Sequence, residues 1–320
     1  MQAWTIETLG QPARLAMLPD PTPASGQAVV RVAACGLNFA DLLMAKGQYQ
    51  ERPDLPFTPG MEFAGVVESL GHDTDGPAIG TRVLTFAGAG GLAERACMPA
   101  DSLLPIPDSM SLTEAAAFPI AYGTSHLALD HKARLQPGET LLVFGAAGGV
   151  GLTAVEIGKR MGARVIACAR GADKLQIAAA AGADHLIDSD APDLKDQLKA
   201  LGGVDVVYDP VGGPAFDAAL RACRPEGRLL TIGFASGTVP QIPANLLLVK
   251  NLTVIGLYWG GYLKFRPQVL RDSLATLFGW YESGGLRPHI SHVLPFQDFP
   301  KGLDLLQSRA STGKVVITLP

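Results

Sequence analysis

The chain has 320 residues, of which 48% are hydrophobic and 18% charged, and its formal net charge is −4. The length predicts two domains, and the composition is typical of a compact soluble enzyme with a large core. The acidic balance argues against a protein that binds nucleic acid through phosphate contacts. The sequence contains no secretory signal and no apolar run of transmembrane length, and its four cysteines form no C-x-x-C pair. These features predict a cytoplasmic protein that does not enter a membrane.

The first 115 residues are predicted to be rich in β-strands, because short apolar runs alternate with glycine and proline. The runs cover residues 4–6, 28–32, 63–67 and 82–86. Residues 38–44 are expected to form a short helical turn between strands, and the whole pattern favours a small β-barrel-like unit. Two helices are expected next, the first from about residue 113 and the second over 122–135, where Gln136-Pro137-Gly138 ends it.

Residues 140–174 carry the strongest signal in the chain. An apolar run at 140–144 is followed by the glycine-rich turn 145–151, a helical segment at 152–162 and a second apolar run at 164–169. Strand, glycine turn, helix and strand in this order are the context in which a glycine motif indicates dinucleotide binding. Small residues let the backbone approach a pyrophosphate closely, and the amides at the helix start hold its charge. A purely structural glycine turn is the alternative interpretation.

The residues after the second of these strands indicate which dinucleotide is bound. An acidic residue about twenty positions beyond the glycines usually holds a free ribose hydroxyl. Residues 169–174 instead read Ala-Arg-Gly-Ala-Asp-Lys, so that Arg170 and Lys174 stand where a 2′-phosphate would lie. Arginine offers a planar fork to phosphate and lysine a point charge. The pattern favours NADPH over NADH, although a solvated surface pair, with Asp173 neutralising Lys174, would give the same residues.

The remaining chain alternates between strands and helices. Further strands are expected at 183–188, 204–209, 227–233 and 251–256, with helical segments between them. Such alternation predicts a parallel, doubly wound sheet, because parallel strands need long crossovers. After an aromatic loop come a helix over 266–283 and a last strand over 314–319, which is expected to return to the first domain. The predicted architecture is a Rossmann domain at 118–256, inserted in a split, β-rich catalytic domain of residues 1–117 and 257–320.

The whole chain resembles the medium-chain dehydrogenase/reductase superfamily, and more closely its zinc-free, zeta-crystallin-like quinone oxidoreductase branch. The matching stretches are 38–41 (NFAD), 59–65 (PGMEFAG), 115–119 (AAAFP), 145–151 (GAAGGVG), 251–253 (NLT) and 313–314 (GK). The resemblance implies an α/β protein whose split domain is GroES-like. It also implies NADPH-dependent two-electron reduction in a cleft between the domains, and a homodimer joined through the Rossmann domains.

Two substitutions bear on the metal that other members of this superfamily bind. Zinc-dependent relatives have a ligand cysteine in Cys-Gly-x-Cys-x-x-Asp and a ligand histidine in Gly-His-Glu, where this chain has Asn38 and Met61. Neither replacement is a usual zinc donor, and the four-cysteine lobe of those relatives is absent, so no metal is predicted. Because nothing then lowers the pKa of an alcohol, the predicted reaction is zinc-independent hydride transfer from NADPH to a quinone or to the β-carbon of an α,β-unsaturated carbonyl.

The resemblance also implies roles for single residues. Asn38 and Asp41 are expected beside the nicotinamide, with local turn capping as the alternative, and Tyr49 is expected to bind substrate or to donate a proton, with aromatic packing as the alternative. The other residues expected to contact the cofactor are Tyr122, Thr124, Gly148, Gly149, Val150, Gly151, Arg170, Lys174, Gly233, Phe234, Ser236, Leu257, Tyr258, Trp259 and Arg309.

Two other functions fit the same sequence. The first is double-bond reduction of an alkenal or of an enoyl thioester such as an acyl-CoA, which a basic entrance groove would favour. The second is a non-enzymatic protein that binds NADPH or RNA, which the acidic balance and the lack of basic-aromatic runs disfavour.

Overall fold

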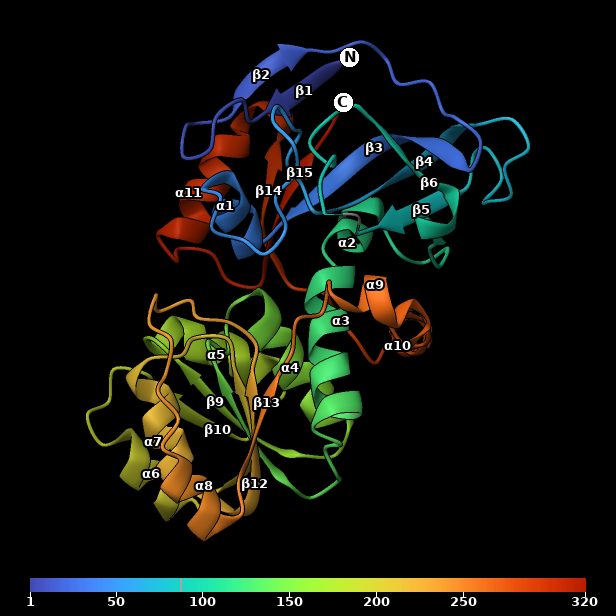
Figure 1. The fold of residues 1–320 in the computed structure, drawn as a ribbon. Helices are drawn as coiled ribbons and strands as arrows, with labels where there is room; N and C mark the ends of the chain where they lie inside the picture. The colour runs from blue at the N-terminus through green and yellow to red at the C-terminus, as the bar shows by residue number, and fades with distance from the viewer. Residues whose placement is uncertain (87) are drawn as a thin grey trace. The chain divides into compact units, whose positions relative to one another are not determined.

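The structure, a computed structural model, describes residues 1–86 and 88–320 and divides into two compact units (Figure 1). Unit 1 comprises Met1–Ile120 and Pro288–Pro320, and unit 2 comprises Ala121–Arg287. The expected boundaries differ from this division at two places: residues 118–120, expected in the Rossmann domain, lie in unit 1, and residues 257–287, expected in the split domain, lie in unit 2. Helix α10 (Pro267–Glu282) explains the second difference, since its Ser273 is hydrogen-bonded to His126 at 2.8 Å and Arg160 lies 4.8 Å from the ring of its Trp280.

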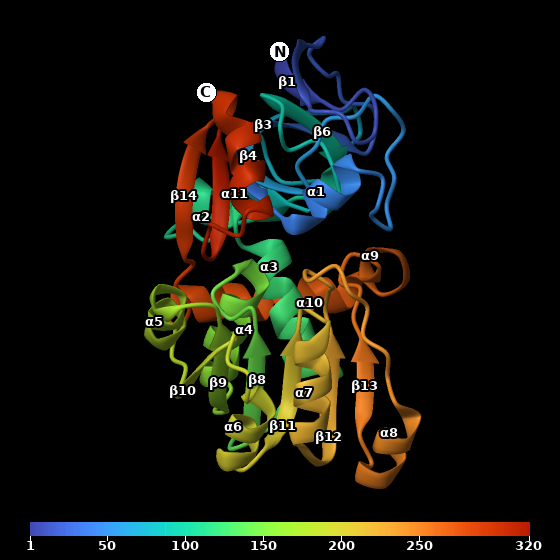
Figure 2. The ribbon, with the colours of Figure 1, turned by 90° about the vertical axis from the view of Figure 1, so that its left-hand side faces the viewer.

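Unit 2 is built on a six-stranded parallel sheet with the strand order β10-β9-β8-β11-β12-β13 (Figure 2). In chain order the strands are β8 (Thr140–Phe144), β9 (Arg164–Ala169), β10 (His185–Asp188), β11 (Val204–Asp209), β12 (Cys223–Thr231) and β13 (Thr253–Gly256). Every neighbouring pair is parallel. The order is that of a dinucleotide-binding sheet, 3-2-1-4-5-6, so the predicted Rossmann fold is confirmed.

The apolar runs form the central strands of this sheet because a parallel sheet is covered on both faces. All five residues of β8 are buried. The crossover helices of unit 2 cover the two faces of the sheet. Phe216 and Leu220 of one such helix, for example, pack with Phe144 and Ile166 of the sheet. The helices between the strands are α4 (Gly149–Arg160), α5 (Ala172–Ala180), α6 (Leu194–Ala200), α7 (Pro214–Ala222) and α8 (Ala244–Lys250).

The helix expected over 122–135 is displaced in the structure. It begins at Pro119 as α3 (Pro119–His126) and continues as a π-helical segment, η2 (Leu127–Lys132). Hydroxyl groups fix α3 to the Rossmann core: Ser125 Oγ lies 2.8 Å from Thr153 Oγ1 and 3.0 Å from Tyr208 Oη. The helix is therefore held by buried polar contacts with α4 and β11.

Unit 1 contains a seven-stranded sheet and a separate pair of strands. The sheet follows the order β14-β15-β3-β4-β5-β7, with β6 paired to β3, and β1 pairs with β2. The strands are β1 (Gln2–Thr5), β2 (Arg14–Met17), β3 (Gln27–Leu37), β4 (Glu62–Leu70), β5 (Arg82–Thr85), β6 (Arg95–Pro99), β7 (Leu104–Pro105), β14 (Ile290–Pro295) and β15 (Lys314–Thr318). The GroES-like, β-rich unit expected from the sequence is confirmed.

The last strand of the chain completes this sheet. β15 pairs antiparallel with β3, with Val315 opposite Leu37 and Thr318 opposite Ala34, and β14 pairs with the other edge of β15. The helices of unit 1 are α1 (Phe39–Ala45), α2 (Leu112–Ala116) and α11 (Phe299–Gln307), with 3-10 turns η1 (Ala100–Ser102) and η3 (Phe296–Asp298). Unit 2 also holds α9 (Tyr262–Phe265). None of the helices in the described part of the chain is long and apolar enough to cross a membrane.

Candidate active site

Most of the residues expected to bind the cofactor follow strands of unit 2 at one edge of the sheet. Because all six strands are parallel, the loops after β8, β9, β11, β12 and β13 leave from the same edge. Ligands of such sheets bind outside the carboxyl ends of the strands, where the strand order reverses. That point lies between β8 and β11 here, and Gly145 is next to Val211: a Cβ on Gly145 would be 3.3 Å from Val211 Cγ2.

Gly151 and Gly148 in the turn after β8 are glycines for different physical reasons. A Cβ on Gly151 would lie 2.1 Å from the carbonyl oxygen of Gly145, so the turn itself requires glycine there. Gly148, the N-cap of α4, is exposed, has φ −84° and ψ 174°, and a Cβ there would come no closer than 3.3 Å to Gly145 O. Any residue adopts that backbone conformation. The space left at Gly148 therefore fits the close approach of a ligand.

The start of α4 is open to an anion. The first amides of a helix have no partner within the helix, and Gly148 provides no side chain to cap those of Gly149, Val150 and Gly151. The first turn of α4, described in full, contains no acidic residue, so its partial positive charge is not neutralised locally. Together with the space at Gly148, this geometry suits a pyrophosphate.

Arg170, the first residue after β9, forms an ion pair with Asp190. Its Nε lies 3.0 Å from an Asp190 carboxylate oxygen, and the two side chains are 62% and 61% exposed. Exposed ion pairs contribute little free energy, so a phosphate can replace Asp190 at the guanidinium. Lys174 lies on α5 in the same crossover. The sequence did not reveal Asp190 as a partner of Arg170, because it follows the neighbouring strand β10, twenty residues further on.

The loops after β12 and β13 carry the other expected contacts. Phe234 and Tyr258 are 40% and 37% exposed, whereas Leu257 is buried. Ser236 Oγ accepts a hydrogen bond from Thr238 N, which holds its hydroxyl inside its own turn. The loop of Gly233 runs over the end of β11, since Ala235 N donates to Pro210 O at 3.0 Å.

Trp259 packs against α3. A Cβ on Gly123 would lie 2.6 Å from Trp259 Cζ2, so the indole occupies the space over that glycine, and the indole is only 7% exposed. Thr124, the next residue of α3, is buried as well. The structure therefore gives Trp259 a packing role and brings it to the helix that carries Thr124.

Tyr122 also has a structural partner. Its hydroxyl donates to Glu156 Oε2 at 2.6 Å, while Glu156 Oε1 accepts from the backbone N–H of Arg287 at 2.6 Å. Burial raises the pKa of Glu156, and the two hydrogen bonds oppose that shift. Tyr122 thus connects α3 to α4 and, through Glu156, to the last residue of unit 2. The expected contacts of Tyr122 and Thr124 with the cofactor stay predictions.

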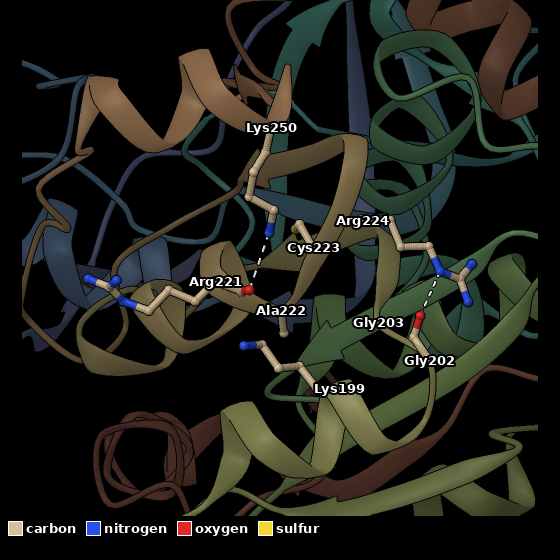
Figure 3. Close-up of a pocket in the computed structure, with 8 residues that line it drawn as sticks. All are labelled: Lys199, Gly202, Gly203, Arg221, Ala222, Cys223, Arg224 and Lys250. Atoms are coloured by element: carbon tan, nitrogen blue, oxygen red, sulfur yellow. Dashed lines mark hydrogen bonds between the residues drawn. The ribbon is translucent and has the colours of Figure 1, made fainter.

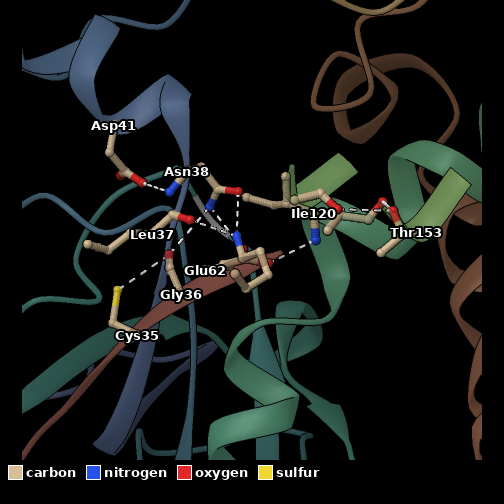
Figure 4. A network of polar contacts seen from close by, with 11 residues as sticks. Cys35, Gly36, Leu37, Asn38, Asp41, Glu62, Ile120 and Thr153 are labelled. Carbon is tan, nitrogen blue, oxygen red and sulfur yellow. Dashed lines mark hydrogen bonds and ion pairs between the residues drawn. The ribbon is translucent and has the colours of Figure 1, made fainter. Parts of the chain in front are cut away.

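In unit 1 a buried polar network surrounds Asn38 (Figure 4). Lys314 Nζ donates to Asn38 Oδ1 and to Glu62 Oε1, both at 2.7 Å, and to Leu37 O at 2.8 Å. Asn38 Nδ2 donates to Glu62 Oε1 at 2.9 Å. Glu62 Oε2 accepts from Ile120 N at 2.8 Å. The carboxylate of Glu62 is 0% exposed and Lys314 only 6%, so the pair is shielded from water.

Asp41 lies beside this network and caps α1. Its Oδ2 accepts from Asn38 N at 2.8 Å, and among the described residues its Oδ1 has no hydrogen-bond partner. Burial is the main reason why the pKa of Asp41 rises to about 7, with a smaller contribution from the charge of Glu62. The backbone N–H groups of Asn38 and Gly60 and the charge of Lys314 oppose the rise. The capping interpretation applies to Asp41, and a contact with substrate stays a prediction.

Tyr49 and Arg309, two other expected site residues, also lie in unit 1. Tyr49 is half-buried and packs against the apolar cluster formed by Ile6, Met44, Phe57 and Met61. Arg309 follows α11 and has a left-handed backbone with φ 57°. A catalytic role of Tyr49 and a phosphate contact of Arg309 stay predictions.

The residues at the position of the catalytic zinc in related enzymes do not suit a metal. Met61 is 7% exposed within the apolar cluster, and both polar atoms of the Asn38 amide are engaged in the network. The Lys314 ammonium already neutralises Glu62, which disfavours a second cation beside it. Within the described residues, no group of three or more His, Cys, Asp and Glu could hold a metal ion.

A basic pocket lies at the opposite edge of the Rossmann sheet (Figure 3). Its volume is about 510 Å³, and it lies where α6, α7 and α8 end and β11 and β12 begin. Lys250 Nζ donates to Leu220 O and Arg221 O, and Arg224 Nε donates to Gly202 O. These cations satisfy carbonyl groups at helix ends. The pocket contains none of the expected site residues and belongs to the architecture of the sheet.

Comparison with known proteins agrees with this geometry. Residues 24–108 match the family described as alcohol dehydrogenase GroES-like domain, and residues 149–276 match the zinc-binding dehydrogenase family. Quinone oxidoreductase-like protein 2 of Bos taurus is 43% identical over 304 residues, which cover 93% of this chain and 87% of that protein. The chain belongs to the quinone oxidoreductase family of the medium-chain dehydrogenase/reductases. This confirms the family resemblance.

Solved structures of this quinone oxidoreductase family have the same fold. The quinone oxidoreductase of Thermus thermophilus, solved alone and with NADPH, superposes with a TM-score of 0.89 at 38% identity and covers 100% of both chains. The quinone oxidoreductase of Escherichia coli, solved with NADPH, superposes with a TM-score of 0.91 at 29% identity and covers 99% of this chain and 100% of that one. The protein is thus an oxidoreductase of the quinone oxidoreductase type.

Proposed function

We propose that this quinone oxidoreductase family member is a zinc-independent, NADPH-dependent reductase of quinones or of the β-carbon of α,β-unsaturated carbonyls. The observation that carries the proposal is the turn after β8, where Gly148 is exposed, has backbone angles that any residue adopts, and has only Gly145 O, at 3.3 Å, within 4 Å of a Cβ built on it. The relatives from Thermus thermophilus and Escherichia coli, whose structures contain NADPH, support the choice of cofactor.

The chain's own residues would hold the cofactor along the carboxyl edge of the sheet. The amides at the start of α4 would bind the pyrophosphate, and Arg170 and Lys174 would bind the 2′-phosphate once Asp190 releases the guanidinium. Phe234 follows β12 and Tyr258 follows β13, and both are partly exposed. They offer apolar surface to the remaining parts of the NADPH molecule. NADPH supplies the hydride.

The residues of unit 1 would serve the electron-accepting substrate. Reduction leaves negative charge on a quinone or carbonyl oxygen, which a hydrogen-bond donor or a proton stabilises. Asn38 Nδ2 is already bonded to Glu62, so the Asn38 amide does not supply that donor. We propose Tyr49 as the donor, with solvent as the alternative source of the proton.

The cofactor site is tested by one substitution and a matched control. Gly148→Ala places a methyl group 3.3 Å from Gly145 O, a tight contact that a shift of a few tenths of an ångström relieves. The fold should therefore tolerate the methyl group, while a bound pyrophosphate should not. Gly279→Ala puts the same methyl on an exposed face of α10, with nothing within 4 Å. We expect NADPH affinity to fall at least about tenfold, or about 1.4 kcal/mol, for Gly148→Ala only. Both variants should stay folded at the assay temperature, as their melting temperatures will show. Wild-type affinity in Gly148→Ala would refute this placement of the pyrophosphate.

The substrate class is tested by following NADPH oxidation with four acceptors. These are 1,4-benzoquinone, 9,10-phenanthrenequinone, a 2-alkenal and crotonyl-CoA, each repeated with NADH. Quinone turnover that prefers NADPH is the expected result. Turnover of the alkenal or the thioester alone would show that the protein reduces carbon–carbon double bonds and not quinones. Tight NADPH binding without turnover of any acceptor would favour the non-enzymatic alternative.

We also propose that two copies of the chain associate through unit 2. Strand β13 pairs with β12 on one side, and its other edge has no strand partner among the described residues. Next to β13 (Figure 2), helix α8 exposes Leu248 and Val249, which are 77% and 70% exposed. An open strand edge bordered by apolar side chains suits pairing with an identical edge about a twofold axis.

The proposed association is tested by light scattering after gel filtration. The wild type should have twice the mass of one 33.5 kDa chain. Leu248→Glu together with Val249→Glu should reduce the mass to that of one chain, whereas Ile79→Glu, at a 65% exposed position of unit 1, should not. A wild type that is monomeric at micromolar concentration would refute the proposed dimer.

A further inference from the structure

Lys314 is a charged residue at the start of an otherwise apolar strand. It precedes Val315, Val316 and Ile317 in β15, all of which are 0% exposed, and it is itself only 6% exposed. A lysine in such a place is stable only when its ammonium is paired and fully hydrogen-bonded. All three of its N–H donors have acceptors, namely Leu37 O, Asn38 Oδ1 and Glu62 Oε1.

These contacts determine how the Asn38 amide is oriented. Its oxygen faces the ammonium of Lys314 and its nitrogen faces the carboxylate of Glu62. Rotating the amide by 180° would place NH₂ against NH₃⁺ and a carbonyl oxygen against a carboxylate. Both contacts would then be repulsive, so a single orientation is stable. The second N–H of the amide points toward Gly36 O, at 3.4 Å from the nitrogen.

We infer that Lys314 is a positioning residue for the reductase, acting with Glu62 to hold Asn38 as a hydrogen-bond acceptor. The inference rests on the proposed function. Both amide N–H groups are directed into the network, and Oδ1 already accepts from Lys314, so any further contact of the Asn38 amide with a ligand is made by Oδ1 as an acceptor. As an acceptor, Oδ1 selects an N–H or O–H group of a ligand, such as a carboxamide or a ribose hydroxyl, and does not stabilise the oxygen on which negative charge develops.

The inference predicts that Lys314 matters only through Asn38. Lys314→Met alone would leave the buried carboxylate of Glu62 unpaired and would destabilise the fold. Lys314→Met combined with Glu62→Gln removes both charges and keeps an amide that can accept from Ile120 N. This paired variant should fold and bind NADPH, whereas kcat for the best acceptor should fall at least about tenfold.

A double-mutant cycle separates positioning from a merely structural role. In an Asn38→Ala background the paired change at Lys314 and Glu62 should cause no further loss of kcat, because the group that it positions is gone. An equal loss of kcat in both backgrounds would overturn the inference. Melting temperatures, measured on all four proteins, show whether a loss of kcat reflects the fold.

A second readout does not depend on turnover and remains valid if the proposed reaction is wrong. Protein labelled with ¹⁵N in asparagine should give side-chain amide signals, and the pair assigned to Asn38 is the one that disappears in Asn38→Ala. Fixed by Lys314 and Glu62, this pair should be shifted and should exchange slowly with solvent. In the paired variant it should move to ordinary positions and exchange faster. An unchanged pair would overturn the positioning of Asn38 by Lys314, whatever the acceptor panel shows.

Discussion

Replacing Asp41 by asparagine should stabilise the protein above pH 7. Asp41 is only 2% exposed, and burial raises its pKa from 3.8 to about 7. The charged groups that act on it are Glu62, which adds to the rise, and Lys314, which opposes it. The pKa of the nearby Cys35 thiol is raised mainly by burial, and the charges of Asp41 and Glu62 add to that rise. Asparagine has no proton to lose, and its oxygen can still accept from the N–H of Asn38.

The size and sign of the effect follow from the two pKa values. Between about pH 4 and pH 7 the carboxyl group holds its proton in the native state and loses it in the unfolded state. The free energy of unfolding therefore falls as the pH rises through this window. The pKa difference between 3.8 and about 7 is about 3 units, and each unit corresponds to about 1.4 kcal/mol. The full loss, present above pH 7, is about 4 kcal/mol.

Denaturant unfolding at pH 5 and pH 8 measures this effect. The wild type should lose more stability between these two pH values than Asp41→Asn. The difference should approach 3 kcal/mol, because about two units of the Asp41 pKa shift lie between pH 5 and the native pKa of about 7. Asp217→Asn, a control at a position with 53% side-chain exposure, should retain the wild-type pH dependence. The reasoning is wrong if Asp41→Asn is less stable than the wild type at pH 8, since Asp41 would then be a stabilised carboxylate.

Three further predictions concern the candidate site. Arg170→Ala combined with Lys174→Ala should raise the dissociation constant for NADPH at least about tenfold and leave that for NADH nearly unchanged; equal losses would argue against the 2′-phosphate assignment. Tyr49→Phe should lower kcat at least about tenfold if the hydroxyl donates a proton, and an unchanged kcat would assign the proton to solvent. Gly151→Ala should lower the melting temperature strongly, because its Cβ would lie 2.1 Å from Gly145 O; a wild-type melting temperature would show that the turn can relax.

The local organisation of unit 2 was predictable from the sequence. The strands, the glycine turn and the helix of residues 140–169 are encoded by apolar runs and small residues that act over a few positions. Five elements of unit 1 were missed: the short strands β2, β6 and β7, the strand β14 and the helix α11. β14 contains Ser291 and His292 and is only half-buried at the edge of its sheet, so its apolar signal is weak. α10 was predicted as a helix, but only its contacts with α3 and α4 assign it to unit 2.

The sequence by itself determined the fold class, the family and the position of the glycine turn, because these depend on short-range patterns. Only the tertiary structure decided what Asn38 does. Its partner Lys314 is 276 residues away in the chain, and Lys314 and Glu62 are separated by 252 residues. The sequence contains a hint, a charged residue at the start of each of two apolar strands, but it does not reveal that the two strands flank β3. Buried charges must find partners, and long-range strand pairing selects them.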